Sequence, residues 1–176
     1  MGDSIVSWFV LAILLFWAMG AYTRLVRCRS QGTVSFAVLE GFLDHYVLLV
    51  KTNAPDPQLH ESVQVAWAGL AASAEQFKVS LRFARAQPLH GPAMNALRTA
   101  HGTLCESWAR VRELPAELLD AAWLQALQLE WERVSVKTEM ARVEFNRAVA
   151  NYNEAIGQFP ALLLAWLFGF KPAQTF

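Results

Sequence analysis

The feature that most constrains this fold is a largely apolar stripe of side chains near the end of the sequence. Its members recur at alternating spacings of three and four residues: Leu124, Leu127, Trp131, Val134, Thr138, Ala141, Phe145, Ala148, Tyr152 and Ala155. This spacing keeps the stripe on one side of a helix about 50 Å long, at about 1.5 Å per residue. Because so long and one-sided a helix is not stable alone, the stripe predicts the main helix of a bundle.

Three earlier segments show the same mixed spacing. Their stripes span residues 25–50, 59–84 and 94–111. Short connections rich in proline and glycine separate the segments and favour antiparallel neighbours. No segment alternates with a period of two, which argues against a sheet. The sequence therefore predicts an all-α protein built around an antiparallel, up-down four-helix bundle.

Local signals predict where these helices begin and bend. Asp56 before Pro57 is typical of the start of a helix, and we expect it to cap the second one. Pro115 to Leu118 predicts the opening of the fourth helix. From Leu25 we expect the membrane helix to run on into the bundle. Gly32 lies inside this helix, where glycine costs about 1 kcal/mol, so a bend between anchor and bundle would fall there.

An uncharged segment precedes the bundle. The eighteen residues from Ile5 to Tyr22 include nine Leu, Ile, Phe or Val residues, which favour membrane insertion by about 3 to 5 kcal/mol. Eighteen residues are about the minimum for crossing the hydrocarbon core. The sequence predicts a transmembrane helix over residues 5–22, a short extracytoplasmic segment over 1–4 and the bundle domain over 23–176, with lipid contacting residues 5–22.

Flanking charges predict the orientation of this helix. Asp3 precedes it, whereas Arg24, Arg27 and Arg29 follow it. The positive-inside rule then places the N-terminus outside and the bundle in the cytoplasm, as in a single-pass protein of the inner membrane. A cleaved signal peptide is the alternative, with residues 18–21 as a small-residue site, although the usual basic start is missing.

A second apolar segment follows the fourth helix. Phe159-Pro160 ends that helix, Pro160 can begin a short one over residues 161–168, and Gly169 can end it. This segment is too short to span a bilayer. It either folds back across the open end of the bundle or dips into the membrane interface through its large apolar side chains. These are Leu162, Leu163, Leu164, Trp166, Leu167, Phe168 and Phe170.

The fourth helix also carries a long motif in one register. Its residues are Arg142, Phe145, Asn146, Val149, Tyr152, Asn153, Ile156, Phe159 and Pro160, followed by Gly169-Phe170 and Phe176. This motif resembles the C-terminal signature of the LemA family, R-x-x-Y-N-x-x-V-x-x-Y-N-x-x-I-x-x-F-P followed by G-F. Phe145 stands where the family has tyrosine, which keeps the ring and loses the hydroxyl. The resemblance implies a LemA-like bundle behind a membrane anchor and supplies no biochemical activity.

The first part of the chain resembles the same family less closely. Residues 22–26, Tyr-Thr-Arg-Leu-Val, are similar to the family's Y-N-x-L-V. The family's next block, R-R-x-D-L-I-P-N-L-V, corresponds to residues 41–50, where the proline is absent.

Asn146 and Asn153 admit two interpretations. Seven residues apart, they lie on one side of the fourth helix, at the margin of its stripe. They either hydrogen-bond to a neighbouring helix and fix its register, or form a recognition ridge for a partner. The motif residues are the candidates for partner contact: Tyr22, Arg142, Phe145, Asn146, Tyr152, Asn153, Phe159, Pro160, Gly169 and Phe170.

No pattern in the sequence indicates a reaction site. The four histidines lack metal-ligand spacing, and there is no phosphate-binding loop or nucleophile motif. Fifteen basic residues balance fifteen acidic ones, which argues against nucleic acid as a partner. We expect no catalytic, cofactor or metal site, no small-molecule substrate, and free thiols at Cys28 and Cys105.

These observations favour an interaction or scaffold module at the inner-membrane surface, with a membrane protein or a second copy of the chain as partner. The alternative is a membrane-remodelling or oligomerising protein that uses the apolar C-terminal segment.

Overall fold

The computed structural model describes residues 2–118 and 120–176. Met1, the first residue of the predicted 1–4 segment, lies outside them. The described elements are α1 (Gly2–Thr52), α2 (Glu61–Ala86), α3 (Gly91–Arg112), a 3₁₀ turn (Ala116–Leu118), α4 (Ala121–Gly157) and α5 (Ala161–Phe168). These residues form helices and loops without a strand, so the prediction of an all-α protein is confirmed.

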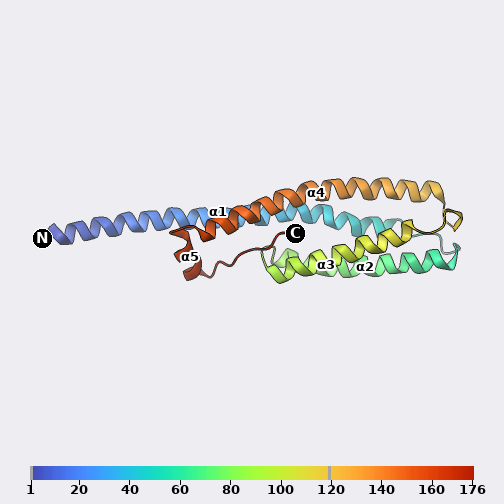
Figure 1. Ribbon diagram of the computed structural model, residues 1–176, viewed down its shortest axis with the longest axis horizontal. Helices are drawn as coiled ribbons and strands as arrows, with labels where there is room; N and C mark the ends of the chain where they lie inside the picture. The colour runs from blue at the N-terminus through green and yellow to red at the C-terminus, as the bar shows by residue number, and fades with distance from the viewer. Residues whose placement is uncertain (1, 119) are drawn as a thin grey trace.

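The long helices pack in pairs. α1 lies along α4, α2 lies along α3, and α1 also contacts α2, so the two pairs enclose one core (Figure 1). The predicted stripes supply this core. On α4 every member of the stripe is buried except Leu124, which is half-buried.

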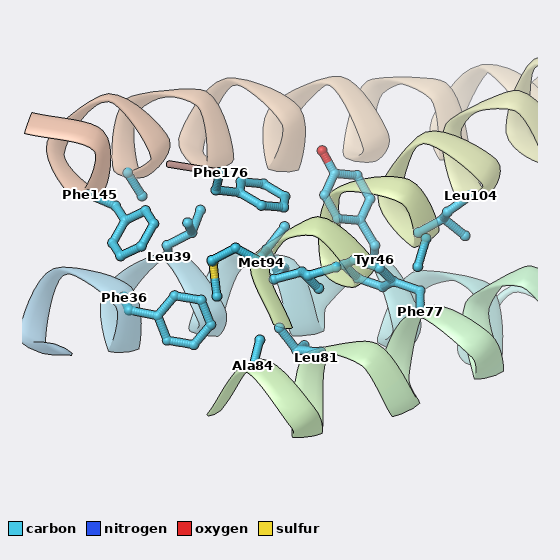
Figure 2. Packing of buried hydrophobic residues seen from close by; sticks show 14 of the residues in the cluster. Phe36, Leu39, Tyr46, Phe77, Leu81, Ala84, Met94, Leu104, Phe145 and Phe176 are labelled. Atoms are coloured by element: carbon cyan, nitrogen blue, oxygen red, sulfur yellow. The ribbon is translucent and has the colours of Figure 1, made fainter. Parts of the chain in front are cut away.

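Aromatic side chains from different helices meet in the core (Figure 2). The rings of Phe36 on α1 and Phe145 on α4 lie 5.5 Å apart edge to face. Trp108 on α3 stacks on Trp131 on α4 at 4.7 Å, and Tyr46 on α1 lies 4.7 Å from the same indole. Such ring pairs add about 0.5–1.5 kcal/mol each beyond the apolar area that they bury.

The first helix runs on into the bundle as expected, because α1 continues as one helix from Gly2 to Thr52, and it is not interrupted at Gly32, where a bend would have fallen. Gly32 is buried, and a Cβ atom there would meet Cδ2 of Leu89 at 3.0 Å. Leu89 belongs to the loop between α2 and α3. The glycine therefore allows this loop to approach α1 closely and does not interrupt the helix.

Two helices begin later than predicted. α2 starts at Glu61, where Nδ1 of His60 accepts a hydrogen bond from the Ser62 N–H at 3.2 Å. Asp56, the expected cap, instead accepts the Gln58 N–H at 2.8 Å within a turn. α4 starts at Ala121 behind Asp120, whose carboxylate accepts the Ala122 N–H at 2.8 Å. Each helix begins at a side chain that satisfies its free N–H groups.

The first turns of α1 extend beyond the other helices (Figure 1). Their large apolar side chains are exposed: Trp8, Phe9, Val10, Leu11, Ile13, Leu14, Leu15, Phe16, Trp17 and Met19. From Leu25 onward the inward-facing side chains of the same helix belong to the core. Within the described part of the chain, α1 is the one helix long and apolar enough to cross a membrane.

Candidate functional site

Most of the motif residues gather around the last residues of the chain, 170–176, which we call the tail. Gly169, with φ of +69°, ends α5 in the left-handed conformation and turns the chain back toward the bundle. The tail then runs between α4 and α3 (Figure 1). Its Ala173 and Phe176 side chains are buried.

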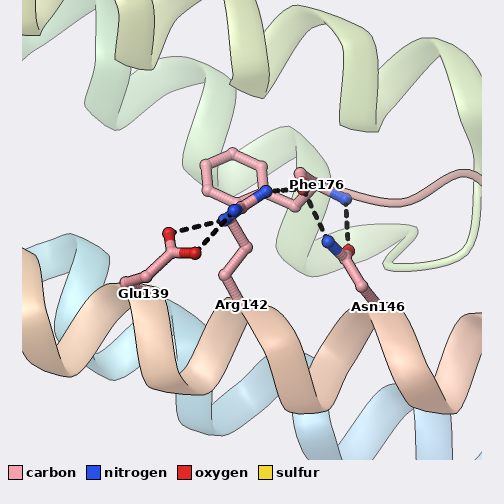
Figure 3. Close-up of polar contacts among 4 residues, drawn as sticks. All are labelled: Glu139, Arg142, Asn146 and Phe176. Carbon is pink, nitrogen blue, oxygen red and sulfur yellow. Dashed lines mark hydrogen bonds and ion pairs between the residues drawn. The ribbon is translucent and has the colours of Figure 1, made fainter.

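Two asparagines of α4 bind the tail backbone. Nδ2 of Asn153 donates to the Ala173 carbonyl at 2.9 Å, and the Ala173 N–H donates to Oδ1 of Asn153 at 2.8 Å. Asn146 makes the same pair of bonds with Phe176, at 3.0 Å and 2.9 Å (Figure 3). Each amide side chain thus satisfies both backbone groups of one residue, as a neighbouring strand would. We call these four hydrogen bonds the asparagine ladder.

The spacing of the two asparagines matches the length of the tail segment between them. Seven residues of α-helix rise about 10.5 Å. Three residues of extended chain cover about 10 Å. Asn146 and Asn153 therefore reach Phe176 and Ala173 only when the tail is nearly extended, with its direction opposite to that of α4.

Further side chains hold the tail at both ends. The Tyr152 hydroxyl donates to the Lys171 carbonyl at 3.0 Å, and burial raises the pKa of this phenol, which keeps its proton in place. Nη1 of Arg142 donates to the Phe176 carbonyl at 3.3 Å, while Glu139 accepts two hydrogen bonds from the same guanidinium at 2.6 and 2.8 Å (Figure 3). Arg98 of α3 donates to the Thr175 carbonyl. The contacts are almost all to backbone carbonyls and amides.

The Phe176 ring enters the core, where it meets a half-buried histidine. Its centroid lies 5.6 Å from the His101 imidazole, which also contacts Tyr46 at 5.5 Å and Phe77 at 5.7 Å. Burial, and secondly the charge of Arg142, lower the pKa of His101 below its ordinary 6.5. The imidazole is therefore held in its neutral form among aromatic rings.

The model of the LemA family matches residues 59–176, which is more than half of the 176-residue chain. The chain belongs to the LemA family. The match covers α2 to α5 and the whole tail, and all of α1 lies outside it. Neither a curated protein nor a solved structure matches this LemA protein.

The LemA motif divides into two groups in space. Arg142, Asn146, Tyr152 and Asn153 hold the tail, as described above. The hydrogen bonds of the two asparagines run to the tail, not to a neighbouring helix as one of our interpretations expected. Phe145, the residue without the family's hydroxyl, is fully buried against Phe36 and faces the core.

The second group surrounds α5 and the emerging part of α1. Phe159 packs against Trp17 at 5.4 Å, and Tyr22 packs against Phe168 at 5.2 Å. Phe170 lies 6.5 Å from Tyr22 and 5.7 Å from the guanidinium carbon of Arg29. Pro160, half-buried, precedes α5, and Gly169 ends it. Residues of α1 and of the segment around α5, far apart in sequence, are thus brought together where α1 leaves the bundle.

Sequence reasoning missed most of the groups in the hydrogen bonds that hold the tail. These are the Arg98 side chain and the backbone of Lys171, Ala173 and Thr175. The available signal was the spacing of three between Ala173 and Phe176, which equals the reach of two asparagines seven apart on a helix. A shallow groove of about 320 Å³ lies beside the tail. It is lined by Arg29, Thr33, Ala86, Gln87, Pro88, Leu89, His90, Tyr152, Gly169, Phe170 and Lys171. Among the residues that the structure describes, no three His, Cys, Asp or Glu side chains gather to hold a metal ion.

Proposed function

We propose that this LemA protein is a non-enzymatic interaction module anchored in the inner membrane. Residues 5–22 span the bilayer with the N-terminus outside, and residues 23–176 form an antiparallel, up-down four-helix bundle at the cytoplasmic surface. A membrane protein or a second copy of the chain is the partner, and no cofactor, nucleic acid or small-molecule substrate is required.

The observation that supports this proposal best is the course of α1. Its large apolar side chains are exposed up to Met19, whereas from Leu25 onward its inward-facing side chains lie in the core of the bundle. The helix is unbroken between these two parts. A domain built on the anchoring helix itself stays close to the membrane, which raises its effective concentration toward partners in the same bilayer.

The exposed side of α4 offers a place to test partner binding. Large apolar side chains recur along it at spacings of seven, four and three residues: Leu129, Val136, Met140 and Val143. A photo-reactive amino acid at Met140, in intact membranes, is expected to give adducts of defined mass. Thr99, exposed on α3, is the matched control position. If Met140 gives no reproducible adduct beyond those seen at Thr99, the scaffold proposal fails.

Orientation is tested separately by labelling cysteines with a membrane-impermeant reagent. The starting variant carries Cys28→Ala and Cys105→Ala, and single cysteines are then placed at Ser4 and at the exposed Glu132. Labelling of position 4 alone in sealed cells supports an outside N-terminus. Labelling of position 132 alone rejects a cytoplasmic bundle.

A second candidate function, membrane remodelling or oligomerisation, is favoured by the apolar exposed side of α5. Its test is the size of reconstituted vesicles and the oligomeric state of the full chain. The double variant Leu163→Ser and Leu167→Ser changes exposed side chains and leaves the core intact. If both the vesicle diameter and the oligomeric state equal those of the unmodified protein, this candidate is rejected.

A further inference from the structure

α5 has no polar side chain on any side. Its sequence from Ala161 to Phe168 is ALLLAWLF. Ala161 and Ala165 are buried and face the rest of the protein, so the small side chains allow close packing. The large ones point outward, with Leu163 60% and Trp166 84% exposed. An eight-residue helix that exposes this surface to water is unfavourable, and soluble proteins rarely tolerate such a patch.

The position of α5 is defined by the anchor. Phe159, just before α5, contacts Trp17, and Phe168 at its end contacts Tyr22. Trp17 lies five residues before the end of the predicted membrane span, which is a depth of about 7.5 Å along α1. Helices that lie in the plane of a membrane bury their apolar side about 5–10 Å into the boundary between headgroups and acyl chains. The two depths agree.

The direction of α5 is also that of an in-plane helix. Figure 1 shows α5 running across the axis of α1, whereas the other helices run along it. If α1 crosses the bilayer, α5 runs across the membrane normal and rises from the level of Trp17 to that of Tyr22. Its exposed apolar side then continues the exposed apolar surface of α1, and the two meet at the Trp17–Phe159 contact.

Basic side chains lie where headgroups would be. Arg24, Arg27 and Arg29 follow the span on α1, and Lys171 lies two residues after the end of α5 at Gly169. All four are exposed. Cations at this level interact favourably with anionic phosphate groups, by about 1 kcal/mol each near a charged bilayer.

The asparagine ladder fixes the height of α5. Only three residues, 158–160, join α5 to α4. At its other end, four residues separate Phe168 from Ala173, which Asn153 holds with two hydrogen bonds. α5 is thus held between two points on the same helix. Asn153 is a positioning residue for it, and Asn146 supports Asn153 by fixing the rest of the tail.

We infer that α5 lies in the cytoplasmic-side interface of the bilayer beside the anchor, with lipid covering Leu162, Leu163, Trp166 and Leu167, and that the asparagine ladder holds it there. This inference rests on the proposed spanning of the membrane by residues 5–22. It gives the motif of α4 a role in the chain's own attachment, because the tail that the motif binds holds α5, the second membrane contact, in place.

The experiment measures the depth of nitroxide labels in the full chain, reconstituted in nanodiscs of phosphatidylcholine and phosphatidylglycerol at three to one. The starting variant is again Cys28→Ala and Cys105→Ala. Labels are attached at Leu163→Cys on α5, Phe9→Cys on the anchor and Val136→Cys on the outside of α4, all of them exposed. Collisions with oxygen report lipid, and collisions with a water-soluble nickel chelate report water.

The expected result is that position 163 resembles position 9, with oxygen collisions several-fold more frequent than nickel collisions, while position 136 shows the reverse. If position 163 resembles position 136 while position 9 lies in lipid, the inference is overturned and the anchor stands. Shielding of position 163 from both reagents also overturns it, because protein and not lipid then covers α5. If position 9 is in water, the anchor itself is refuted.

The role of the ladder is tested by adding Asn153→Asp to the variant labelled at position 163. We expect oxygen collisions at 163 to fall and nickel collisions to rise by at least twofold. Asn151→Asp, the same change at an exposed position of α4, should leave both unchanged. An unaltered depth in the Asn153→Asp protein would show that α5 is placed without the ladder.

Discussion

Replacing Asn153 by Asp tests the asparagine ladder with a change of one atom. The amide both donates to and accepts from Ala173, at 2.9 and 2.8 Å. A carboxylate keeps the acceptor and replaces the donor by a second oxygen, which then faces the Ala173 carbonyl. The lost hydrogen bond is worth about 1 kcal/mol, and the unpaired carbonyl beside a charge adds about 1–2 kcal/mol at this half-buried position.

Together these terms weaken the closed tail by about 2–3 kcal/mol, which makes its opening about 30- to 150-fold more frequent. Hydrogen–deuterium exchange of the full chain measures how often the tail opens, because the N–H groups of Ala173 and Phe176 both donate to the asparagine side chains of the ladder. We expect peptides that contain residues 170–176 to exchange faster by that factor, while peptides from the α2–α3 pair are unchanged.

Asn151→Asp is the matched control for this variant. Asn151 is exposed on the same helix, so the same change of charge there should alter exchange of the tail less than twofold. Acid provides a second control, since a protonated carboxyl at position 153 can again donate to the Ala173 carbonyl. The difference between the variant and the unmodified protein should therefore shrink below about pH 4, near the ordinary pKa of Asp. Equal exchange in the Asn153→Asp and unmodified proteins at neutral pH would refute the reasoning.

Three further predictions concern the bundle. Phe176→Ala removes a ring that is 6% exposed and should lower the free energy of unfolding in denaturant by about 3 kcal/mol, whereas a loss below about 1 kcal/mol would contradict its burial. Because the folded state lowers the pKa of His101, the stability that its neutral form confers is complete above about pH 6.5 and is lost as the pH falls toward the lowered value. Melting curves at pH 7.5 and 5.5 should show this loss, and His101→Gln should reduce it; an identical loss in the variant would assign it to other groups. Gly41→Ala meets open space and should stabilise α1 by about 0.5–1 kcal/mol, while Gly32→Ala should gain less because Leu89 must move, and an equal gain at both sites would be inconsistent with that contact.

The sequence was most informative where burial repeats along a helix. The stripes of all four long helices are recovered because a period of three and four residues records which side faces the core, and Leu124 alone on α4 falls short of full burial. The bounds of α5 also agree with prediction, since Pro160 and Gly169 limit the helix by their own backbone preferences.

The misplaced features depend on contacts between distant residues. Nothing near Gly32 in sequence shows that Leu89 packs against it, and Asp56 offers the same capping group whether it starts a helix or closes a turn. For the site, the motif singled out Asn146 and Asn153, but an amide side chain fits a helix, a partner or an extended strand equally well. Only the fold brings the tail within 3 Å of both side chains.

The unbroken course of α1 makes it a rigid arm. If residues 5–22 span the bilayer as we propose, thirty residues, 23–52, separate the membrane surface from its far end, a length of about 45 Å. Membrane helices adjust to bilayer thickness by tilting, and a tilt of about 10° would swing the loop after Thr52 sideways by about 8 Å. On that proposal, a protein bound at this loop would be displaced when the thickness of the bilayer changes, without contacting the lipid itself.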